Sequence, residues 1–318
     1  PQLVVLDMGS QMLPHISVLY KDIIAALQPK SSGRYVDATV GAGGHAWGLL
    51  DASSPDGQLL GLDLDPRALE LANQRLALFN GRFTLLHSSY TTLLESLQRL
   101  SWDHVDGIVI DLGVSSMQID TPERGFSFIK DGPLDMRFNP SQQTSAADLV
   151  NTLPEEDLAS ILWEYGEEKF SRRIARAIVG NRPFSTTLQL ASIIEKAVGK
   201  SSGKIHPATR SFQALRIATN HELDSLQEFL PQAIQALAPQ GRLAVISFHS
   251  LEDRIVKQYF RRESSDCICP PEQPVCTCDH TATIKEISRH PIEADEEEKQ
   301  SNPRARSARL RIAEKLSV

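Results

Sequence analysis

The sequence predicts an α/β fold in which a parallel sheet carries helices on both faces and is interrupted by a helical insert. Three observations support this prediction. Short apolar segments of strand character alternate with amphipathic helical segments over the first third of the chain. From about residue 119 to residue 221 the patterns are mainly helical. Strand character then returns, so the helical residues interrupt the sheet pattern and do not end it.

Four strands with helices between them are expected before the insert. A helical pattern over residues 16–27 precedes them, and Pro29 is a usual stop signal for that helix. The expected strands cover residues 34–40, 58–63, 83–86 and 105–111, and the helices between them include residues 45–50 and 66–79. Strands alternating with helices in this way predict that the strands run parallel.

Residues 119–221 are expected to form an inserted helical domain that binds the substrate, with residues 1–118 and 222–318 as the α/β core. Helical patterns in the insert cover residues 155–165, 171–179 and 188–198. The core resumes with a helix over residues 223–237, a turn at 239–241 and a strand at 242–248. Residues 284–287 and 308–312 are candidates for the closing strands, and the acidic run at 293–299 is a candidate for a solvated loop or helix.

Composition places the chain among soluble globular proteins. Its 318 residues are 41% hydrophobic and 23% charged, which suffices for a core and one further domain. No run approaches eighteen uncharged apolar residues, so no membrane span is expected. The first residues lack the basic and apolar regions of a secretory signal, which predicts a cytoplasmic protein. The sequence begins with Pro1, and Met8 and Met12 are candidates for the natural start.

The net charge of −7 argues at first against a nucleic-acid partner. Net charge is a poor guide, however, because contacts to phosphates depend on local patches. Basic residues do cluster, within residues 172–176, 254–262 and 304–311. Each cluster fits a solvated surface balanced by acids as well as it fits a phosphate-binding patch. Composition therefore neither excludes RNA nor requires it.

All four cysteines fall in one short window with paired C-x-C spacing. They are Cys267, Cys269, Cys276 and Cys278. A disulfide framework would spread over a small secreted domain, so this pattern suits a structural metal site better. Paired C-x-C is a less usual spacing than C-x-x-C, and a reduced or redox-labile loop is the alternative. In either case the cysteines are expected to be structural.

The first chemical signal is a glycine loop directly after the first expected strand, at residues 37–45 (DATVGAGGH). Such a loop lets the backbone approach a ligand, and the helix that follows offers free N–H groups. Ala46 also fits a dinucleotide fingerprint, so nicotinamide binding is not excluded by spacing. Asp37 stands where methyltransferases place an acid, and Asp63 ends the second strand, where a carboxylate accepts ribose hydroxyls. Asp65 with Pro66 also fits an ordinary helix start.

The second signal is the segment after the fourth expected strand, residues 111–116 (DLGVSS). Ligands of open parallel sheets bind beyond the carboxyl ends of the strands, so Asp111 should face the glycine loop. Methyltransferases that act on amino groups place an Asp or Asn in this loop. The amino nitrogen of cytosine is a poor nucleophile because its lone pair is delocalised into the ring. A carboxylate that accepts hydrogen bonds from this amino group favours attack of its nitrogen on a methyl group. The enzyme then mainly has to align the nitrogen with that methyl group.

With these residues in place, the chain resembles the bacterial 16S ribosomal RNA (cytosine-N4)-methyltransferases, the MraW or small-subunit methyltransferase H family. Several matching motifs are specific to that family and not only to its fold. They are residues 15–19 (HISVL), 37–45, 111–116, 124–128 (RGFSF), 131–137 (DGPLDMR), 165–170 (YGEEKF), 206–213 (HPATRSFQ), 247–254 (SFHSLEDR) and 302–307 (NPRARS).

The resemblance implies a Rossmann-like class I methyltransferase sheet with an inserted helical substrate-recognition domain, and S-adenosyl-L-methionine as the cofactor. It implies N4-methylation of a cytosine in the decoding region, with 16S ribosomal RNA within the small subunit as the partner; a homodimer is left open. Tyr90 replaces the Phe of other members, but an aromatic side chain beside adenine is retained. The implied cofactor contacts are Gly43, Gly44, His45, Asp63, Tyr90, Asp111 and Gln118.

For catalysis, Asp111, Ser115 and His249 are the candidates, with His249 either a general base or a hydrogen-bonding wall. The candidate substrate contacts are Ser116, Phe126, Arg137 and Ser250. Residues 124–137 are expected either to close over the pocket, with Phe126 or Phe128 stacking on a base, or to bury those rings within the insert.

Three other functions remain open from the sequence. They are a methyltransferase of the same core that acts on DNA or protein, a non-catalytic ribosome-assembly factor that keeps the pocket, and a nicotinamide oxidoreductase. The intact Asp111 loop argues against an assembly factor. Only the product and the bound cofactor separate the remaining alternatives.

Overall fold

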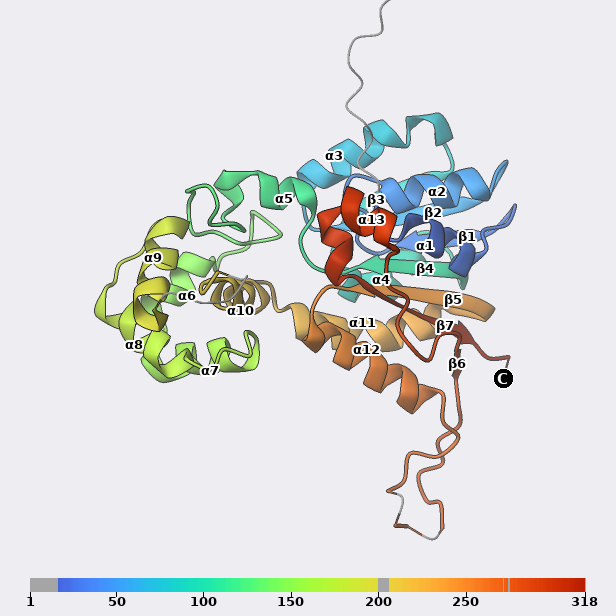
Figure 1. Ribbon diagram of the computed structural model, residues 1–318. Coiled ribbons are helices and arrows are strands. Elements are labelled where there is room, and N and C mark those ends of the chain that lie inside the picture. Colours follow the sequence, from blue (N-terminus) through green and yellow to red (C-terminus); the bar gives the residue numbers. More distant parts are fainter. Residues whose placement is uncertain (1–16, 200–205, 271, 274, 318) are drawn as a thin grey trace, which may run out of the picture.

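The computed structural model describes residues 17–199, 206–270, 272–273 and 275–317. These residues contain a seven-stranded sheet in the order β3-β2-β1-β4-β5-β7-β6 (Figure 1). Strands β1 to β5 are parallel, and β7 is antiparallel to both β5 and β6. The strands are β1 Arg34–Asp37, β2 Gln58–Asp63, β3 Phe83–His87, β4 Val105–Asp111, β5 Leu237–Ser247, β6 Ile284–Glu286 and β7 Arg309–Lys315. The predicted Rossmann-like α/β class is confirmed.

The helices of the core precede and follow a helical region between β4 and β5. Those of the core are α1 Tyr20–Leu27, α2 Gly44–Ala52, α3 Pro66–Arg75, α4 Leu93–Arg99, α11 Glu222–Ala236, α12 Ser250–Glu263 and α13 Glu296–Ser301. Between β4 and β5 lie α5 Ser116–Asp120, α6 Ala146–Thr152, α7 Glu155–Glu164, α8 Ser171–Gly180, α9 Thr187–Val198 and α10 Thr209–Asn220. Single 3-10 turns are η1 Ala77–Phe79, η2 Tyr90–Thr92, η3 Pro122–Arg124 and η4 Pro303–Ser307.

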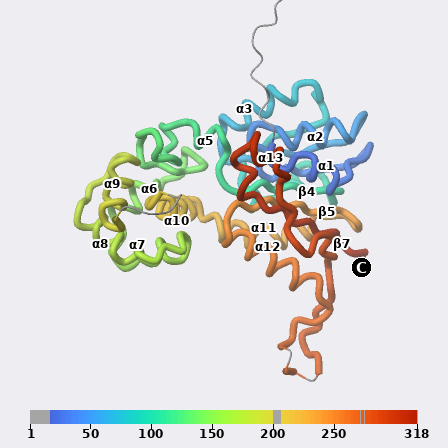
Figure 2. Tube along the Cα trace, in the orientation of Figure 1, coloured from blue at the N-terminus to red at the C-terminus, as the bar shows by residue number. Residues whose placement is uncertain are grey.

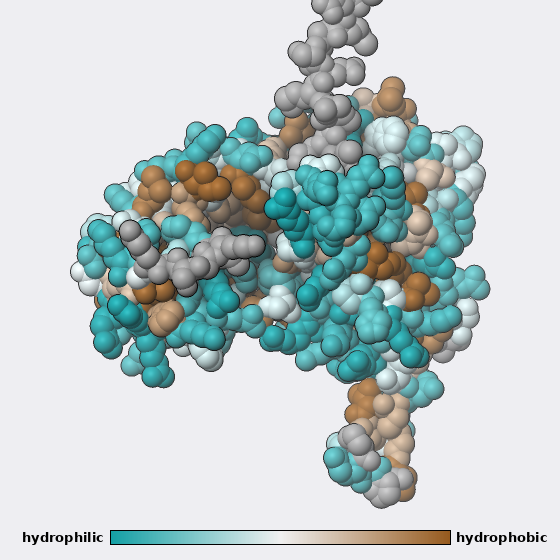
Figure 3. Space-filling view, in the orientation of Figure 1, coloured by the Kyte–Doolittle hydropathy of each residue, from teal (hydrophilic) through white to brown (hydrophobic). Residues whose placement is uncertain are grey.

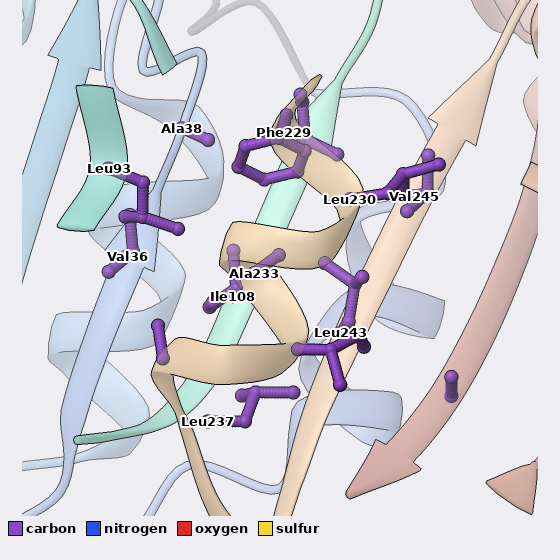
Figure 4. Close-up of a cluster of buried hydrophobic side chains, with 14 of the residues drawn as sticks. Val36, Ala38, Leu93, Ile108, Phe229, Leu230, Ala233, Leu237, Leu243 and Val245 are labelled. Carbon is purple, nitrogen blue, oxygen red and sulfur yellow. The ribbon is translucent and has the colours of Figure 1, made fainter. Parts of the chain in front are cut away.

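Both faces of the sheet are covered, and alternate strand residues supply the two hydrophobic cores. In β4, Ile108 and Ile110 pack on the face of α4, α11 and α12, whereas Val109 packs on the face of α1, α2 and α3. Figure 4 shows the first of these cores, with Phe229 and Leu230 of α11 against the sheet. Burial on both faces explains why the strands are apolar at nearly every position.

Helices α6 to α10 have a hydrophobic cluster of their own. Leu158, Ile174 and Leu190 are buried in it with side chains from all five helices, and none belongs to either core cluster of the sheet. Figure 2 shows this helical region lying beside the core. His221, in a left-handed conformation with φ of 51°, joins α10 directly to α11. The division of the chain into a core of residues 1–118 and 222–318 and an inserted domain of residues 119–221 stays a prediction.

Three local predictions need correction. The turn expected at residues 239–241 lies within β5: Val105 pairs with Leu237 and Gly107 with Arg242, so an irregularity absorbs the extra residues. The helix expected over residues 66–79 ends at Arg75 and continues only as η1. The first helix begins at Tyr20, and residue 16, like Met8, Met12 and His15, lies outside the described residues. In the described part of the chain, every helix is too short or too polar to cross a bilayer.

Candidate functional site

A cavity of about 850 Å³ lies at the carboxyl ends of β1, β2 and β4. The strand order reverses here, because β2 lies on one side of β1 and β4 lies on the other. Open parallel sheets bind ligands at this switch point. The loops after the three strands form most of the wall, and Phe138 and Arg304 complete it from distant parts of the chain.

The glycine loop forms the wall beside β1. Gly43 has a left-handed φ of 79° and precedes α2. A Cβ atom at Gly44 would lie 1.8 Å from Ser17 Oγ, so a larger residue there would have to displace the Ser17 side chain. The buried His45 is fixed by a 2.9 Å contact from its Nε2 to the carbonyl oxygen of Val18. The loop therefore presents backbone and the start of a helix to the cavity.

Two acids near this loop have different positions. Asp63 lines the cavity, and its carboxylate accepts hydrogen bonds from the N–H groups of Gly41 at 2.8 Å and Asp65 at 2.9 Å. Burial raises the pKa of Asp63 to about 6. Asp37 is buried behind the loop and does not line the cavity, and burial raises its pKa to about 7. Only Asp63 is placed to accept hydroxyl groups of a ligand.

Asp65 is both a helix cap and the centre of a polar network. It accepts the N–H of Arg67 at 3.0 Å, as expected for the start of α3. Its other oxygen accepts from Gln118 Nε2 at 3.2 Å and forms an ion pair with Arg124. Gln118, which lines the cavity, is thereby fixed against the β2 end of the site. No sequence pattern predicts the contact with Arg124.

Asp111 ends β4 at the centre of the cavity wall. Its N–H donates to Thr39 Oγ1 at 2.8 Å, which ties the ends of β1 and β4 together. Its Oδ1 is enclosed yet has no hydrogen-bond partner in the described structure. Burial raises the pKa of Asp111, and the nearby His45 opposes the shift. An enclosed carboxylate oxygen without a donor is costly, so this carboxylate has capacity that a bound ligand can use.

The loop after Asp111 is held from both sides. Ser115 accepts the N–H of Gln118 at 3.2 Å, and Gln118 Oε1 accepts the N–H of Ser115 at 3.0 Å, which caps α5. Arg304 of η4 donates to Ser116 Oγ at 3.0 Å and to the carbonyl oxygen of Val114. Its guanidinium also lies 5.4 Å from the ring centre of Phe248. Arg304 was part of a recognised motif but was not predicted as a site residue.

Beside Asp111, the wall contains two glutamates that the sequence did not identify. Glu222 accepts two hydrogen bonds from Arg216, at 2.8 and 3.0 Å, and burial raises the pKa of Glu222. Burial opposes ionisation of Glu252, but its contacts with His249, Arg216 and the N–H of Phe248 together outweigh burial and lower that pKa. His249 does not line the cavity: it caps α12, with Nε2 3.1 Å from Glu252 Oε1. His249 therefore reaches the cavity only through Glu252, and its two predicted roles stay predictions.

The structure brings most predicted cofactor residues together. Gly44, His45, Asp63, Tyr90, Asp111 and Gln118 line the cavity, and Gly43 adjoins them. Tyr90 packs edge-on against Phe229 with ring centres 5.3 Å apart, and burial raises the pKa of its hydroxyl. An aromatic wall is therefore present at the position where the sequence predicted one.

The predicted substrate residues divide into two groups. Ser116 lines the cavity together with the catalytic candidate Ser115, whereas Phe126, Arg137 and Ser250 do not. Phe126 stacks on Phe138 with ring centres 5.6 Å apart, and Phe138 reaches the cavity. Phe128 packs on Phe212 within the insert. Ser250 donates to Glu167 Oε2 at 2.9 Å, which joins α12 to the turn between α7 and α8.

Comparison with known proteins identifies close relatives. A family model described as the MraW methylase family matches residues 12–316. The chain is 53% identical over 303 residues to the ribosomal RNA small subunit methyltransferase H of Dehalococcoides mccartyi, covering 95% of this chain and 87% of that one. It is 51% identical over 307 residues to the protein of the same name from Geobacter sp., covering 95% and 98%. A solved rRNA methylase from Streptococcus thermophilus aligns at 12% identity over 94% of each chain, with a TM-score of only 0.41.

Proposed function

This chain belongs to the MraW methylase family, and from that premise we propose that it methylates the exocyclic N4 amino group of a cytosine in the decoding region of 16S ribosomal RNA. Its cofactor is S-adenosyl-L-methionine. The names of the relatives support ribosomal RNA of the small subunit as the substrate. The observation that carries the choice of an amino group is the Asp111 carboxylate, whose Oδ1 accepts no hydrogen bond from the described part of the chain.

The residues of the cavity fit this cofactor. The cavity of about 850 Å³ is large enough for a nucleoside-sized ligand together with part of a second one. Asp63 has acceptor capacity for ribose hydroxyls beside the glycine loop, and Tyr90 offers an aromatic face for adenine. In this proposal the cofactor is held by Gly43, Gly44, His45, Asp63, Tyr90, Asp111 and Gln118. When bound, it would supply a methyl group on a positively charged sulfur, and a neutral thioether would be left once the carbon–sulfur bond is broken.

Asp111 prepares the amino group of the target base. Its carboxylate accepts an N–H hydrogen bond from the cytosine N4 amino group, which weakens delocalisation of the nitrogen lone pair and directs it for attack. The nitrogen gains a methyl group and loses one proton. Because burial raises the pKa of Asp111, its carboxylate is a better proton acceptor than an exposed aspartate and takes that proton before solvent does.

The remaining residues position the loop and the base. Ser115 and Arg304 hold the loop that carries Asp111, and His249 holds Glu252 in the wall. Phe138 stacks on the flipped base, with Phe126 behind it. Ser116, Arg137 and Ser250 contact the RNA strand on either side of the target.

The test is methyl transfer from labelled S-adenosylmethionine to small ribosomal subunits that lack the modification, with the product nucleoside mapped by mass spectrometry. N4-methylcytidine that disappears with Asp111→Ala is the expected result. Asp103→Asn is the matched control, because Asp103 is exposed at the opposite end of β4. Naked 16S RNA, DNA and protein serve as parallel substrates. Cofactor binding without transfer to the subunit or its RNA would contradict the proposal.

A further inference from the structure

The segment between α12 and β6 is a long arm without regular structure. Its described residues from 264 to 283 contain neither helix nor strand. Figure 1 shows the arm projecting from the core beyond α12 and β6. Loops of this length without secondary structure are uncommon in compact proteins unless something ties them. At the base of the arm, Thr283 donates its N–H to the carbonyl oxygen of Glu263 at 2.8 Å, but this bond does not reach the tip.

Apolar packing does not hold the tip either. Ile268 is 40% exposed and Val275 is 69% exposed, and neither belongs to a core cluster. Figure 3 shows hydrophobic residues at the surface of the arm. A segment that buries so little apolar surface needs another source of folding free energy.

The four cysteines of the chain meet at this tip. All are free thiols, and their sulfurs lie within 4.8 Å of one another. The distance from Cys276 Sγ is 4.0 Å to Cys269 Sγ and 3.5 Å to Cys278 Sγ. The distance from Cys278 Sγ to Cys267 Sγ is 3.9 Å. Four sulfurs at about 2.3 Å from a central zinc ion form a tetrahedron with edges of about 3.8 Å, which these distances match.

Backbone N–H groups turn toward the same sulfurs. Ile268 donates to Cys278 Sγ at 3.4 Å, Cys269 donates to Cys267 Sγ at 3.4 Å, and Thr277 donates to Cys269 Sγ at 3.5 Å. Such donors stabilise the negative charge of thiolates, which are the form that binds metal. The backbone is thus folded around the sulfurs, although no core fixes the arm.

We propose that Cys267, Cys269, Cys276 and Cys278 bind one zinc ion that folds the arm. Each thiol loses its proton on binding, and four thiolates complete the coordination, so no position remains for water or substrate. A polynuclear iron–sulfur cluster would hold its cysteines further apart, because the cluster lies between them. None of the four cysteines lines the cavity, so the ion is structural.

The experiment measures metal in full-length protein purified without a metal-affinity step. Mass spectrometry of the metal content should find about one zinc per chain, and Cys276→Ser/Cys278→Ser should lower it roughly tenfold or more. Val275→Ala, in the same loop, is the matched control and should keep its zinc. Protein reconstituted with Co²⁺ alone should show the visible absorption of a tetrahedral thiolate site, and the double variant should not.

Several outcomes would overturn the proposal. They are wild-type protein that binds neither zinc nor Co²⁺, a double variant that keeps its zinc, and iron in place of zinc. Cofactor affinity, measured on the same preparations, should change less than about twofold in the double variant, because the arm is remote from the cavity. That measurement verifies folding of the core, and it separates a failure of the zinc site from a failure of the proposed methyltransferase activity.

Discussion

Asp111 in the core and Asp135 in the helical insert differ in whether the protein itself supplies hydrogen-bond donors to their carboxylates. Asp135 forms a two-point ion pair with Arg137, at 2.8 and 2.7 Å, and also accepts the N–H of that residue. Burial opposes its ionisation, but these hydrogen bonds outweigh burial and lower its pKa. The pKa of Asp111 is raised by burial, and its Oδ1 has no hydrogen-bond partner among the residues that the structure describes. The fold satisfies the first carboxylate and leaves the second to a ligand.

The contrast separates structural from functional polar groups. A carboxylate that the chain itself satisfies stabilises a turn, and its removal leaves a neighbouring charge unpaired. A carboxylate without donors costs stability in the free protein and is useful only when a ligand supplies the donor. The two residues should therefore respond to the same substitution in opposite ways.

The largest expected effect comes from replacing each aspartate by asparagine. Asp111→Asn should lower the rate of methyl transfer about 100-fold or more, because the proton acceptor is lost, with an unchanged or higher free energy of unfolding. Asp135→Asn should lower the free energy of unfolding by about 1–3 kcal/mol, and it should lower the rate per folded molecule far less than Asp111→Asn does, because Arg137 keeps its charge for the RNA strand. Single-turnover kinetics and denaturant titration measure both quantities. Loss of activity in folded Asp135→Asn would break the comparison.

A smaller effect is expected at Arg304, which holds the loop of Asp111 by hydrogen bonds to Ser116 and Val114. Arg304→Met should lower transfer on the order of tenfold, because the loop can shift while Asp111 stays intact. Arg306→Met is the control on the same 3-10 turn: Arg306 is exposed and, among the described residues, its side chain donates to the carbonyl oxygen of Lys299 alone. Equal losses in the two variants would mean that the turn matters only for folding.

The smallest effect is a pH dependence of stability. Burial raises the pKa of Asp63 from 3.8 to about 6, so the folded protein keeps a proton that the unfolded chain has released. Wild-type stability relative to Asp63→Asn should therefore fall as pH rises from 3.8 to about 6 and then level off. The pH dependence is opposite for Asp56, because hydrogen bonds from Ser32 and Ser31 lower its pKa to about 2. The wild-type protein should therefore be more stable than Asp56→Asn above pH 3.8 and should lose that advantage as the pH falls from 3.8 toward 2. Thermal melting of the wild type and the two variants across this pH range measures both stability differences. A difference between wild type and Asp63→Asn that does not change with pH would contradict the prediction.

The sequence predicts the parallel part of the sheet well, because the apolar pattern of each strand and the residues that end it lie next to each other in the sequence. Apolar strands end at polar residues such as Asp63 and Asp111, and a glycine loop follows the first strand. The bulge within β5 was not predictable, because proline and glycine normally signal a turn. Pairing of Val105 with Leu237 on one side and of Gly107 with Arg242 on the other keeps these residues in the strand.

Much of the cavity wall depends on contacts between distant parts of the chain, which the spacing of residues in the sequence does not predict. In the sequence, Arg304 and Arg311 belong to a run of basic residues that suggests an exposed patch. In the structure Arg311 is buried against Asp253, with 2.7 Å between Nε and Oδ1, and Arg304 faces the cavity. Phe138 and Glu222 reach the cavity from either end of the insert. Their approach to Asp111 is a result of the tertiary fold.

The place of β7 in the sheet has a consequence for synthesis of the chain. β7 is made after every other described strand, yet it lies between β5 and β6 and pairs with both. Arg304, which steadies the Asp111 loop, is made only shortly before it. A nascent chain can form the glycine loop early, but its sheet stays open and its cavity incomplete until this late segment has emerged. The order of translation therefore delays assembly of the working site until the rest of the described chain is in place.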